Sequence, residues 1–449
     1  MPSIYLDRYL IFIIICFGVF FRFAVFWASP VNNSYDDHLE VINIYSEDYK
    51  RPTPFNCWEC YQPPLYYYVA SLVFNVSENL GCNKSVSWKI VQFINPFLSF
   101  LVIIIAVKIL VLLKLSTSSI FITLSFIVSL PVDILTSAMI GNDYMLVFFS
   151  VLSFYFFLKT TSALKSNFQF RFWFIFLILS ATLGSLTKQH GLLIHLFPIA
   201  VLLIYRKLIV KKYFLAIPFY LFAILFSITD ELWKYAQTGQ LLISNQDHFD
   251  YAKQQFPGSL EKIEFFTFRI IELFQHPFIS NFTSASFFTE IFAKTFYDYE
   301  WRFISPQIPF ASIVAIFGYS LGLIWFSYII FSVVKFTYLV RSKKIDLQFH
   351  SFSPKTLTFI LTLLFWLVPL IQTLRFPFFS SMKSMFMLPG IILFLIIFGT
   401  CIKNDAVSKK IGYLVCILNI AYGLLLVVSI LLFLNISVNH LHGPLWPIP

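Results

Sequence analysis

Acidic and aromatic residues gather in one stretch of this chain, between Tyr35 and Tyr68. The stretch opens with Y-D-D-H, in which Asp36 and Asp37 are adjacent and His38 follows them. A carboxylate in such a loop can take a proton from a hydroxyl or an amine, or it can bind a metal ion. Alternatively, the loop is a solvated polar segment, in which the two carboxylates and His38 are only hydrated.

The same stretch continues with C-W-E-C-Y-Q-P-P-L-Y-Y-Y, from Cys57 to Tyr68. The double proline after Gln62 fixes an extended backbone that leads into the next helix. The tyrosines that follow, Tyr66 among them, are typical of the headgroup level of a membrane. Taken alone, this pattern predicts a loop-to-helix transition at a membrane surface.

The composition requires a membrane around these residues. Of the 449 residues 58% are hydrophobic and 12% are charged, and the mean hydropathy is +0.79. A soluble domain usually carries about 25% charged residues, so this chain lacks the polar surface that a globule in water needs. The net charge of +10 fits the basic cytoplasmic loops of membrane proteins, so we expect no nucleic-acid partner.

Because a spanning helix needs about 20 mainly apolar residues, the sequence predicts an all-α, multi-pass protein with about eleven transmembrane helices. The first apolar run is long enough to span and no clear cleavage site follows it, so we interpret it as a retained helix rather than a signal peptide. The predicted spans are 9–28, 90–113, 118–135, 143–159, 172–187, 190–205, 213–229, 309–334, 356–374, 384–402 and 411–434.

The spans form one predicted membrane domain, residues 1–434, followed by a short outer tail, 435–449. Lys and Arg are concentrated in short loops on the side of the N terminus, which the positive-inside rule places in the cytoplasm. Two long loops, residues 29–89 and 230–309, then face outward, and loops of this length are usually functional. In the second loop, helical spacing over Ser259 to Phe274 predicts an interfacial amphipathic helix.

The order of several motifs resembles that of the GT-C membrane glycosyltransferases, in the branch of protein O-mannosyltransferases and lipid A aminoarabinose transferase. The resemblance covers residues 10–402 and departs from the family at Gln62, where Lys is common, and at Asp36-Asp37, where Asp-Glu is usual. We expect no large soluble domain after the last span, unlike in relatives that carry one. The matching segments are Arg22, the acidic pair 36–37, Q-P-P-L-Y-Y at 62–67, G-N-D at 141–143, L-T-K-Q-H-G at 186–191 and K-S-M-F-M-L-P at 383–389.

This resemblance implies transfer of a sugar from a polyprenyl-phosphate donor to a lipid, glycan or protein acceptor, on the non-cytoplasmic face and with inversion. Asp36 would be the general base, with Asp37 beside it, and cations would meet the charge that grows on the phosphate. The resemblance leaves open whether a divalent metal is required, and no other cofactor is expected. The expected phosphate-binding residues are Lys188, Arg375, Lys383 and Arg22, and the expected supporting residues are Asp143, His38, Gln62 and Tyr66.

Each of these roles has a structural alternative. Lysines and arginines at helix ends often extend to the interface without binding a ligand, although Lys188 lies between two apolar runs where a charge is costly. Asp143 could cap the N terminus of the fourth span. Tyr297, Asp298, Glu300 and Trp301 end the second outer loop, where aromatic rings and carboxylates suit sugar binding, but an aromatic membrane belt has the same composition.

The cysteines and glycosylation sequons bear on the compartment. Cys57, Cys60 and Cys82 lie in the first outer loop, where a disulfide between two of them, a zinc site or free thiols all fit the spacing. Asn32, Asn75, Asn83, Asn281 and Asn435 begin N-x-S/T triplets, which would suit a lumenal face. We expect a bacterial inner membrane, with the endoplasmic reticulum as the alternative.

Two other functions are compatible with many spans. A transporter or lipid flippase would have charged or interrupted helices near mid-membrane and often inverted repeats, and the sequence shows neither clearly. A non-catalytic assembly subunit would need the helices but not the acidic pair. The candidate charges gather at the outer face, which favours chemistry at one surface.

Overall fold

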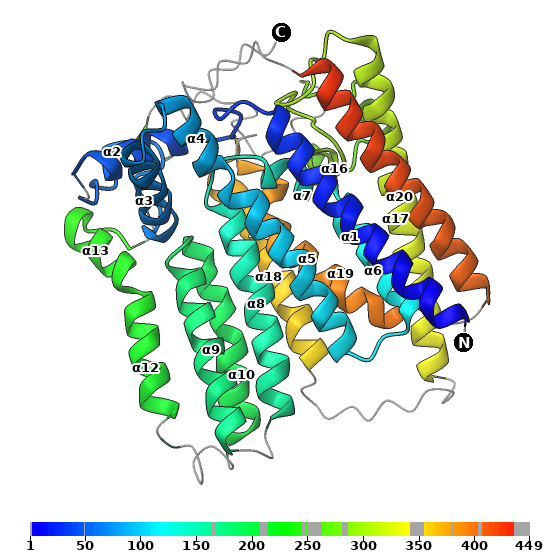
Figure 1. The fold of residues 1–449 in the computed structure, drawn as a ribbon, viewed down its shortest axis with the longest axis horizontal. Helices are drawn as coiled ribbons and strands as arrows, with labels where there is room; N and C mark the ends of the chain where they lie inside the picture. Colours follow the sequence, from blue (N-terminus) through cyan, green and yellow to red (C-terminus); the bar gives the residue numbers. More distant parts are fainter. Residues whose placement is uncertain are drawn as a thin grey trace.

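The apolar runs fold into long helices, and the structure, a computed structural model, is all-α over the residues it describes apart from one bridge between Ile304 and Leu434 (Figure 1). The long helices are α1 (Pro2–Ala28), α5 (Ile94–Leu112), α8 (Asp143–Ser162), α9 (Asn167–Ser185), α12 (Ala216–Ser227), α17 (Pro309–Arg341), α18 (Pro354–Arg375), α19 (Leu388–Phe398) and α20 (Ala406–Phe433). The structure describes residues 2–48, 50–163, 167–206, 214, 216–241, 243–244, 248–249, 263–280, 286–341, 354–378, 381–402 and 406–434.

Over these residues, nine helices are long and apolar enough to cross a membrane, or ten if one bent pair is counted as a span. The prediction of an all-α multi-pass protein is therefore confirmed, whereas the count of eleven is not. The difference lies in two of the predicted spans. The segment predicted at 190–205 is a 3-10 turn, η1 (Gln189–His195), followed by the short helix α10 (Leu196–Ile204), and together they are shorter than a span.

The second difference is a break in the segment predicted at 118–135. It divides into α6 (Thr117–Ser129) and α7 (Pro131–Ser137), whose axes differ by 54°. Leu130, the residue before the proline, is extended, because the proline ring disfavours a helical backbone at the preceding residue. Pro131 then occupies the first turn of α7, where its missing N–H would have no helical partner in any case.

Arg22 explains how this break is tolerated inside the bundle. Its side chain is fully buried, and all five guanidinium N–H donors are used: by Ser99 Oγ, by the Gly18 carbonyl (2.9 Å), by the Val128 and Ile127 carbonyls (3.0 and 3.2 Å), and by Asp133. Val128 and Ile127 are in the last turn of α6, whose carbonyls lose their helical partners at the break. The expectation that Arg22 binds a donor phosphate is therefore wrong, because no N–H remains for a ligand.

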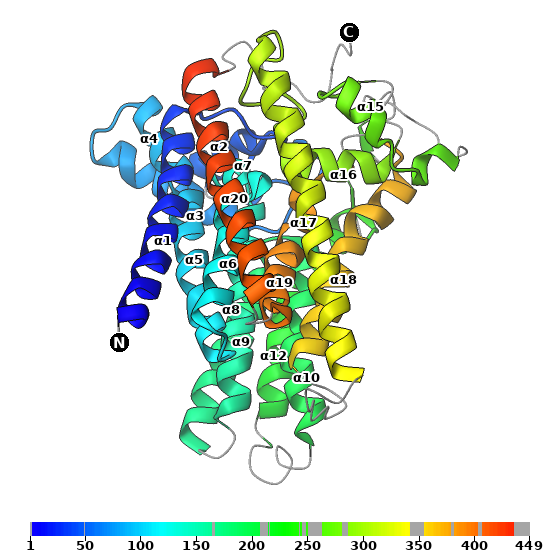
Figure 2. The ribbon, with the colours of Figure 1, turned by 90° about the vertical axis from the view of Figure 1, so that its right-hand side faces the viewer.

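Most of the other helices lie at one end of the bundle, and the N terminus lies toward the other (Figures 1 and 2). Residues 29–89 and 230–309 both contribute to this end, which we call the loop end, so the two long loops lie on the same side as predicted. Its helices are α2 (His38–Asp48), α3 (Leu65–Asn79), α4 (Lys84–Gln92), α13 (Thr229–Thr238), η3 (Ile263–Phe266), α15 (Ile270–Gln275) and α16 (Phe287–Phe296).

The amphipathic helix predicted over residues 259–274 is not continuous. Its first residues lie outside the described part of the chain, and the rest divides between η3 and α15 with residues 267–269 between them. Ser286 donates from its hydroxyl to the Thr267 carbonyl, and the Arg269 amide donates to Thr289 Oγ1 (2.9 Å). These bonds to α16 satisfy the backbone where the helix is interrupted.

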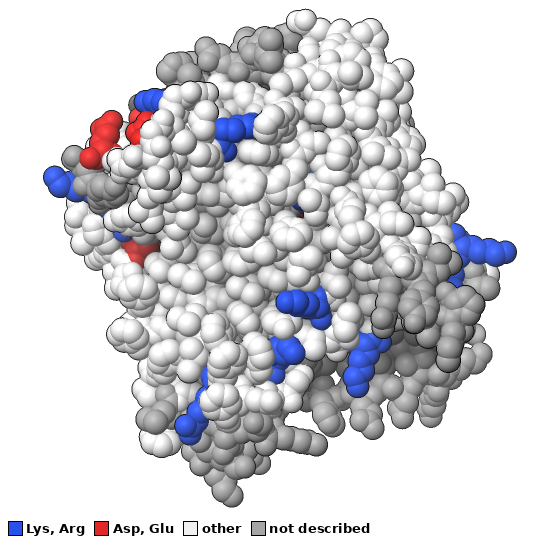
Figure 3. All heavy atoms as spheres, in the orientation of Figure 1, with Lys and Arg blue, Asp and Glu red and all other residues white. Residues whose placement is uncertain are grey.

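The surface seen in Figure 3 is largely free of charge, as a lipid-facing surface should be. Acidic side chains are confined on this face to the region of α2, α3 and α13, at the loop end. The asparagines of two of the predicted sequons make hydrogen bonds within the protein. Asn75 donates to the Ser46 carbonyl (3.0 Å), and Asn83 caps α4, whereas Asn281 and Asn435 lie outside the described residues.

Candidate functional site

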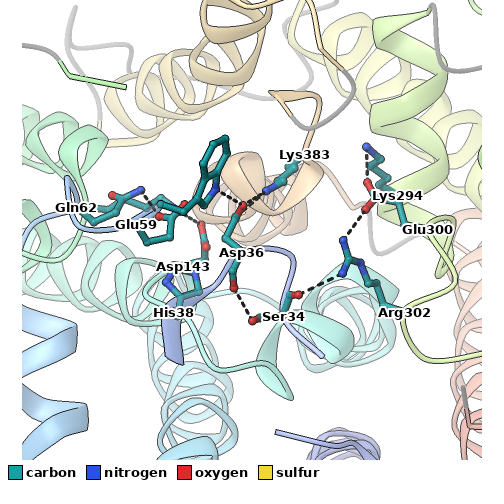
Figure 4. A network of polar contacts seen from close by, with 12 residues as sticks. Ser34, Asp36, His38, Glu59, Gln62, Asp143, Lys294, Glu300, Arg302 and Lys383 are labelled. Carbon is teal, nitrogen blue, oxygen red and sulfur yellow. Dashed lines mark hydrogen bonds and ion pairs between the residues drawn. The ribbon is translucent and has the colours of Figure 1, made fainter. Parts of the chain in front are cut away.

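The acidic pair and the C-terminal basic motif meet at the loop end. Lys383, just before the 3-10 turn η5 (Ser384–Met387), donates from Nζ to both carboxylate oxygens of Asp36, at 2.7 and 2.6 Å (Figure 4). Trp58 Nε1 also donates to Asp36 Oδ1 (3.3 Å). The first outer loop and a segment near the C-terminal end of the chain therefore meet at one carboxylate.

A second ion pair joins the two central motifs. Asp143 is the first residue of α8, and its Oδ1 accepts from Lys188 Nζ, which also lies 4.6 Å from the ring centroid of Phe386. The predicted alternative for Asp143, a helix cap, is wrong. The capping position is Asn142, which makes no side-chain cap bond and instead donates to the Thr187 carbonyl (3.1 Å).

The first outer loop holds these motifs in place. Tyr66 accepts at its hydroxyl from the Gly141 amide (3.0 Å), and the Leu65 amide donates to the Leu186 carbonyl (3.0 Å). The tyrosine and leucine of the double-proline motif thus bond the segments that carry Asp143 and Lys188. Tyr66 thus contacts the backbone just before α8, and its supporting role in a site stays a prediction.

The ion pairs border a cavity of about 150 Å³, large enough for several water molecules. Asp36, Lys383 and Lys188 all line it, together with Gln62 from the double-proline motif. The other lining residues are Trp58, Glu59, Tyr61, Gln189, His190, Ile243, Ser244, Val368, Gln372, Ser381 and Phe386.

Burial and charge act in opposite directions on Asp36. Burial raises the pKa of this carboxyl, but the ammonium of Lys383 and, to a lesser extent, His38 and Lys188 lower it further, to about 2. The carboxylate is therefore ionised at any physiological pH. Glu59 differs, because burial and the neighbouring Asp36 charge together raise its pKa to about 8.

Asp37 and His38 do not share the environment of Asp36. Asp37 does not line the cavity, and its Oδ1 accepts from the Glu40 amide (3.2 Å) at the start of α2, as a helix-capping carboxylate does. His38 is buried rather than solvated, and its Nδ1 lies 2.9 Å from the Tyr67 hydroxyl. Burial lowers the pKa of His38 to about 4, so the ring is neutral. Its contact with Tyr67 joins the loop that carries Asp36 to α3.

Several predicted site residues lie elsewhere. Arg375 is exposed in the last turn of α18, with its guanidinium 4.9 Å from the Phe376 ring, and it does not line the cavity. Tyr297 is buried and donates to the Ala311 carbonyl (3.0 Å). Asp298 is also buried and accepts from the amides of Arg302, Phe303 and Ile304 at 2.7 to 2.9 Å.

Glu300 forms ion pairs with Lys294 (2.7 Å) and Arg302 (3.7 Å), beside the Asp36 loop but outside the cavity (Figure 4). Trp301 adopts a positive φ of 51° in the turn between these residues and likewise does not line the cavity. The prediction that Tyr297, Asp298, Glu300 and Trp301 bind an acceptor or a sugar is therefore wrong for this cavity. Instead, Arg302 donates to the Ser34 carbonyl (3.4 Å), which ties the cluster to the Asp36 loop.

The C-x-x-C motif closes as a disulfide between Cys57 and Cys60, and Cys82 is a free thiol. This pairing excludes the zinc alternative for these two cysteines. Over the described residues, no group of three or more His, Cys, Asp or Glu side chains is arranged to hold a metal ion. Asp36, which lines the cavity, and Asp143 beside it are each paired with a lysine, and Glu59 accepts from Gln62, so the donor set does not fit a divalent metal.

Sequence reasoning missed most of the polar and aromatic residues that line the cavity, which are Trp58, Glu59, Tyr61, Gln189, His190, Ser244, Gln372, Ser381 and Phe386. The signal for the first two was present, because both lie between the cysteines of the C-x-x-C motif. A short disulfide loop fixes the side chains inside it, so a tryptophan and a glutamate at these positions could have been predicted to face a site.

Gly191 holds Lys188 in position, and we predict that Gly191→Ala displaces it. A Cβ at this position would lie 2.1 Å from the Gly184 carbonyl oxygen, a backbone atom that cannot move independently. We expect a loss of stability of about 1–3 kcal/mol and weaker binding of anionic ligands, measured by thermal unfolding and ligand titration of the purified protein. Gly141→Ala is the matched control, because its Cβ would meet only the His38 ring, at 3.1 Å. Equal effects of the two substitutions would contradict this role for Gly191.

Comparisons with known proteins give a limited result. No protein-family profile matches the chain, and neither does any curated protein sequence. Among solved structures, ArnT from Cupriavidus metallidurans matches in its apo state and bound to undecaprenyl phosphate, with TM-scores of 0.37 and 0.38. In both cases the identity is 13%, and the match covers 89% of this chain and 77% of the other.

Proposed function

We propose that this protein transfers a sugar from a polyprenyl-phosphate donor to an acceptor hydroxyl or amine, with Asp36 as the general base. The observation that carries the proposal is the pairing of two cavity lysines with carboxylates: Lys383 with Asp36, and Lys188 with Asp143. Each lysine is held by one carboxylate, and its positive charge can also bind a second anion such as the donor phosphate. A cavity with two such cations and an ionised base suits a reaction whose leaving group is a phosphate.

The reaction follows from this arrangement. The donor phosphate binds between Lys188 and Lys383. It competes with Asp36 for the ammonium of Lys383, so Asp36 is less stabilised by that charge once the donor is bound. Asp36 then accepts the proton of the acceptor hydroxyl or amine, whose lone pair attacks the anomeric carbon from the side opposite the phosphate. The bond from that carbon to the phosphate oxygen breaks, and the electron pair leaves on the lipid phosphate. The configuration at the anomeric carbon is inverted.

The acceptor, whether a lipid, a glycan or a protein, must reach the loop end. The proposed orientation places this end outside the cytoplasm, because the N terminus lies at the opposite end and basic residues concentrate in the loops on that side. A buried disulfide at the loop end supports an oxidising compartment there. We favour a bacterial inner membrane, and the endoplasmic reticulum is the alternative.

The lysines provide the direct test. We predict that Lys188→Met and Lys383→Met each weaken the binding of undecaprenyl phosphate about 10- to 100-fold, since hydrogen bonds to charged groups contribute about 1.5–3 kcal/mol. Binding would be measured by titrating the full chain in nanodiscs. Arg375→Met is the matched control, because it removes a cation of the same loop end that lies outside the cavity. An unchanged affinity in both lysine variants would overturn the proposal, as would transport of a lipid-linked sugar across liposomes without any release of polyprenyl phosphate.

A pH profile tests the state of the base. The pKa of Asp36 is lowered to about 2 and that of His38 to about 4, so both groups keep one charge state from about pH 5 to pH 7. We therefore predict that kcat/KM for transfer has no acid limb in this range. The measurement is the initial rate at low donor concentration, in buffers of constant ionic strength. A fall in kcat/KM between pH 7 and pH 5 that disappears in Asp36→Asn would contradict this environment for the base.

A further inference from the structure

The short disulfide loop Cys57–Cys60 faces the cavity with both of its inner side chains. Trp58 and Glu59 line the cavity although they are only 9% and 3% exposed, so each side chain is otherwise enclosed by protein. Backbone hydrogen bonds hold the loop as two successive turns, from the Cys60 amide to the Cys57 carbonyl (3.3 Å) and from the Gln62 amide to the Glu59 carbonyl (3.1 Å). The disulfide therefore closes a rigid support for these two residues.

This support connects directly to the proposed base. The indole N–H of Trp58 donates to Asp36 Oδ1 (3.3 Å), and Glu59 Oε2 accepts from Gln62 Nε2 (3.0 Å), which also lies 2.8 Å from the Tyr61 hydroxyl. Lys383 and Lys188 belong to different segments and also line the cavity. The cavity thus has a cationic wall, from the lysines, and a wall of aromatic and neutral polar groups, from residues 58–62.

Two buried polar atoms at this cavity make no hydrogen bond with the described part of the protein. They are Oε1 of Gln62, a side chain that is 6% exposed, and Nε2 of His190. Buried polar atoms are seldom left unpaired, because each one costs free energy. A ligand with several hydroxyl groups could pair with both atoms, whereas a bare phosphate could not donate to the Gln62 carbonyl oxygen.

We propose that Trp58, Glu59 and Gln62 form the subsite that binds the sugar ring of the donor, and that the Cys57–Cys60 disulfide fixes its shape. The ligand class is a neutral, polyhydroxylated ring attached to the phosphate that the two lysines hold. Gln62 Oε1 accepts from one ring hydroxyl, and Glu59 bonds another. The indole of Trp58 covers the ring while its N–H orients Asp36 toward the acceptor group that attacks the anomeric carbon. This subsite rests on the proposed function, because the phosphate determines where the ring lies.

The test compares two kinds of probe on the full chain in nanodiscs. The first probe is undecaprenyl phosphate, and the second is undecaprenyl phosphate carrying glucose, galactose, mannose or arabinose. We expect the wild type to bind at least one sugar-carrying lipid more tightly than the bare phosphate. Gln62→Met and Trp58→Ala should each weaken binding of that lipid about tenfold and leave binding of the bare phosphate unchanged.

Two further variants separate recognition from folding. Glu59→Gln should retain most of the affinity that Glu59→Ala loses, because the raised pKa of Glu59 keeps its proton at pH 7 and an amide donates and accepts in the same way. Replacing both Cys57 and Cys60 with serine should reduce affinity for the sugar-carrying lipid alone. In every variant, unchanged binding of the bare phosphate shows that the cavity is folded.

The outcomes distinguish the two proposals. If wild type binds bare undecaprenyl phosphate but prefers none of the sugar-carrying lipids, the subsite is overturned and the phosphate site remains. The subsite is also overturned if the Trp58 and Gln62 variants weaken both probes equally or neither. If wild type binds neither kind of probe, the proposed function itself fails, and the subsite falls with it.

Discussion

Asp36→Asn is expected to reduce sugar transfer about 10²- to 10⁴-fold, the usual contribution of a general base. The substitution keeps the shape of the side chain and removes its ability to accept the proton of the attacking group. The amide oxygen of the variant could still receive one hydrogen bond from Lys383, which in the wild type donates to both carboxylate oxygens. We therefore expect the loss to appear in kcat, measured as release of polyprenyl phosphate, with donor binding retained or strengthened.

The chain supplies a matched control one residue away. Asp37→Asn makes the same chemical change in the same loop, but Asp37 caps α2 and does not line the cavity. We expect transfer close to the wild-type rate and little change in stability, because the side-chain oxygen of Asn caps a helix about as well as that of Asp. If Asp37→Asn abolished transfer while Asp36→Asn did not, the base would be assigned to the wrong member of the pair.

Arg22→Met is expected to destabilise the folded protein by about 3–5 kcal/mol, the largest stability effect that the structure predicts. The substitution removes the cation from Asp133 and leaves that fully buried carboxylate with the Tyr144 hydroxyl (2.7 Å). It also leaves the Ile127 and Val128 carbonyls at the end of α6 without their guanidinium donors. The measurement is the midpoint of thermal unfolding in detergent, followed by size-exclusion chromatography.

A double variant tests the physical reason. Arg22→Met combined with Asp133→Leu removes both charges, and replacing a buried ion pair by apolar groups is often nearly neutral. We expect the double variant to recover a large part of the stability that Arg22→Met loses. Two results would contradict a stabilising role for the Arg22–Asp133 ion pair at the break between α6 and α7. One is a single variant as stable as wild type, and the other is a double variant less stable than the single variant.

The sequence predicted most of the long helices and three of the charged residues that line the cavity, and the reasons can be named. Continuous apolar runs can only be satisfied as helices in lipid, so most span positions followed from hydropathy. Asp36, Lys188 and Lys383 were named because the motifs that contain them resemble those of the GT-C glycosyltransferases in type and order. Their convergence on one cavity could not be derived from spacing, because Lys383 lies 347 residues from Asp36.

Other features depend on contacts that local patterns do not encode. An arginine late in the first helix has the same sequence signature whether its donors face a ligand or the carbonyls of a broken helix, so the role of Arg22 was mistaken. The aromatic and acidic residues 297–301 matched a sugar site in composition, but Asp298 bonds three backbone amides and Glu300 pairs with Lys294. By contrast, Pro131 itself could have predicted the break before it. The prediction instead followed hydropathy, which is continuous across the proline, and gave one span at 118–135.

The way Arg22 is satisfied also constrains how the chain can be assembled in a membrane. Helix α1 is synthesised first, and it carries an arginine inside its apolar span, where a lone charge is costly, by about 2.5–3.5 kcal/mol at the centre of a span on insertion scales. Asp133, which neutralises that charge, follows 111 residues later, and the α6 carbonyls follow at nearly the same distance. Helix α1 therefore cannot reach its final environment until α5, α6 and α7 have been made. The first helix enters the bilayer early. Its Arg22 can form its final contacts only after about a third of the chain, through α7, has been translated.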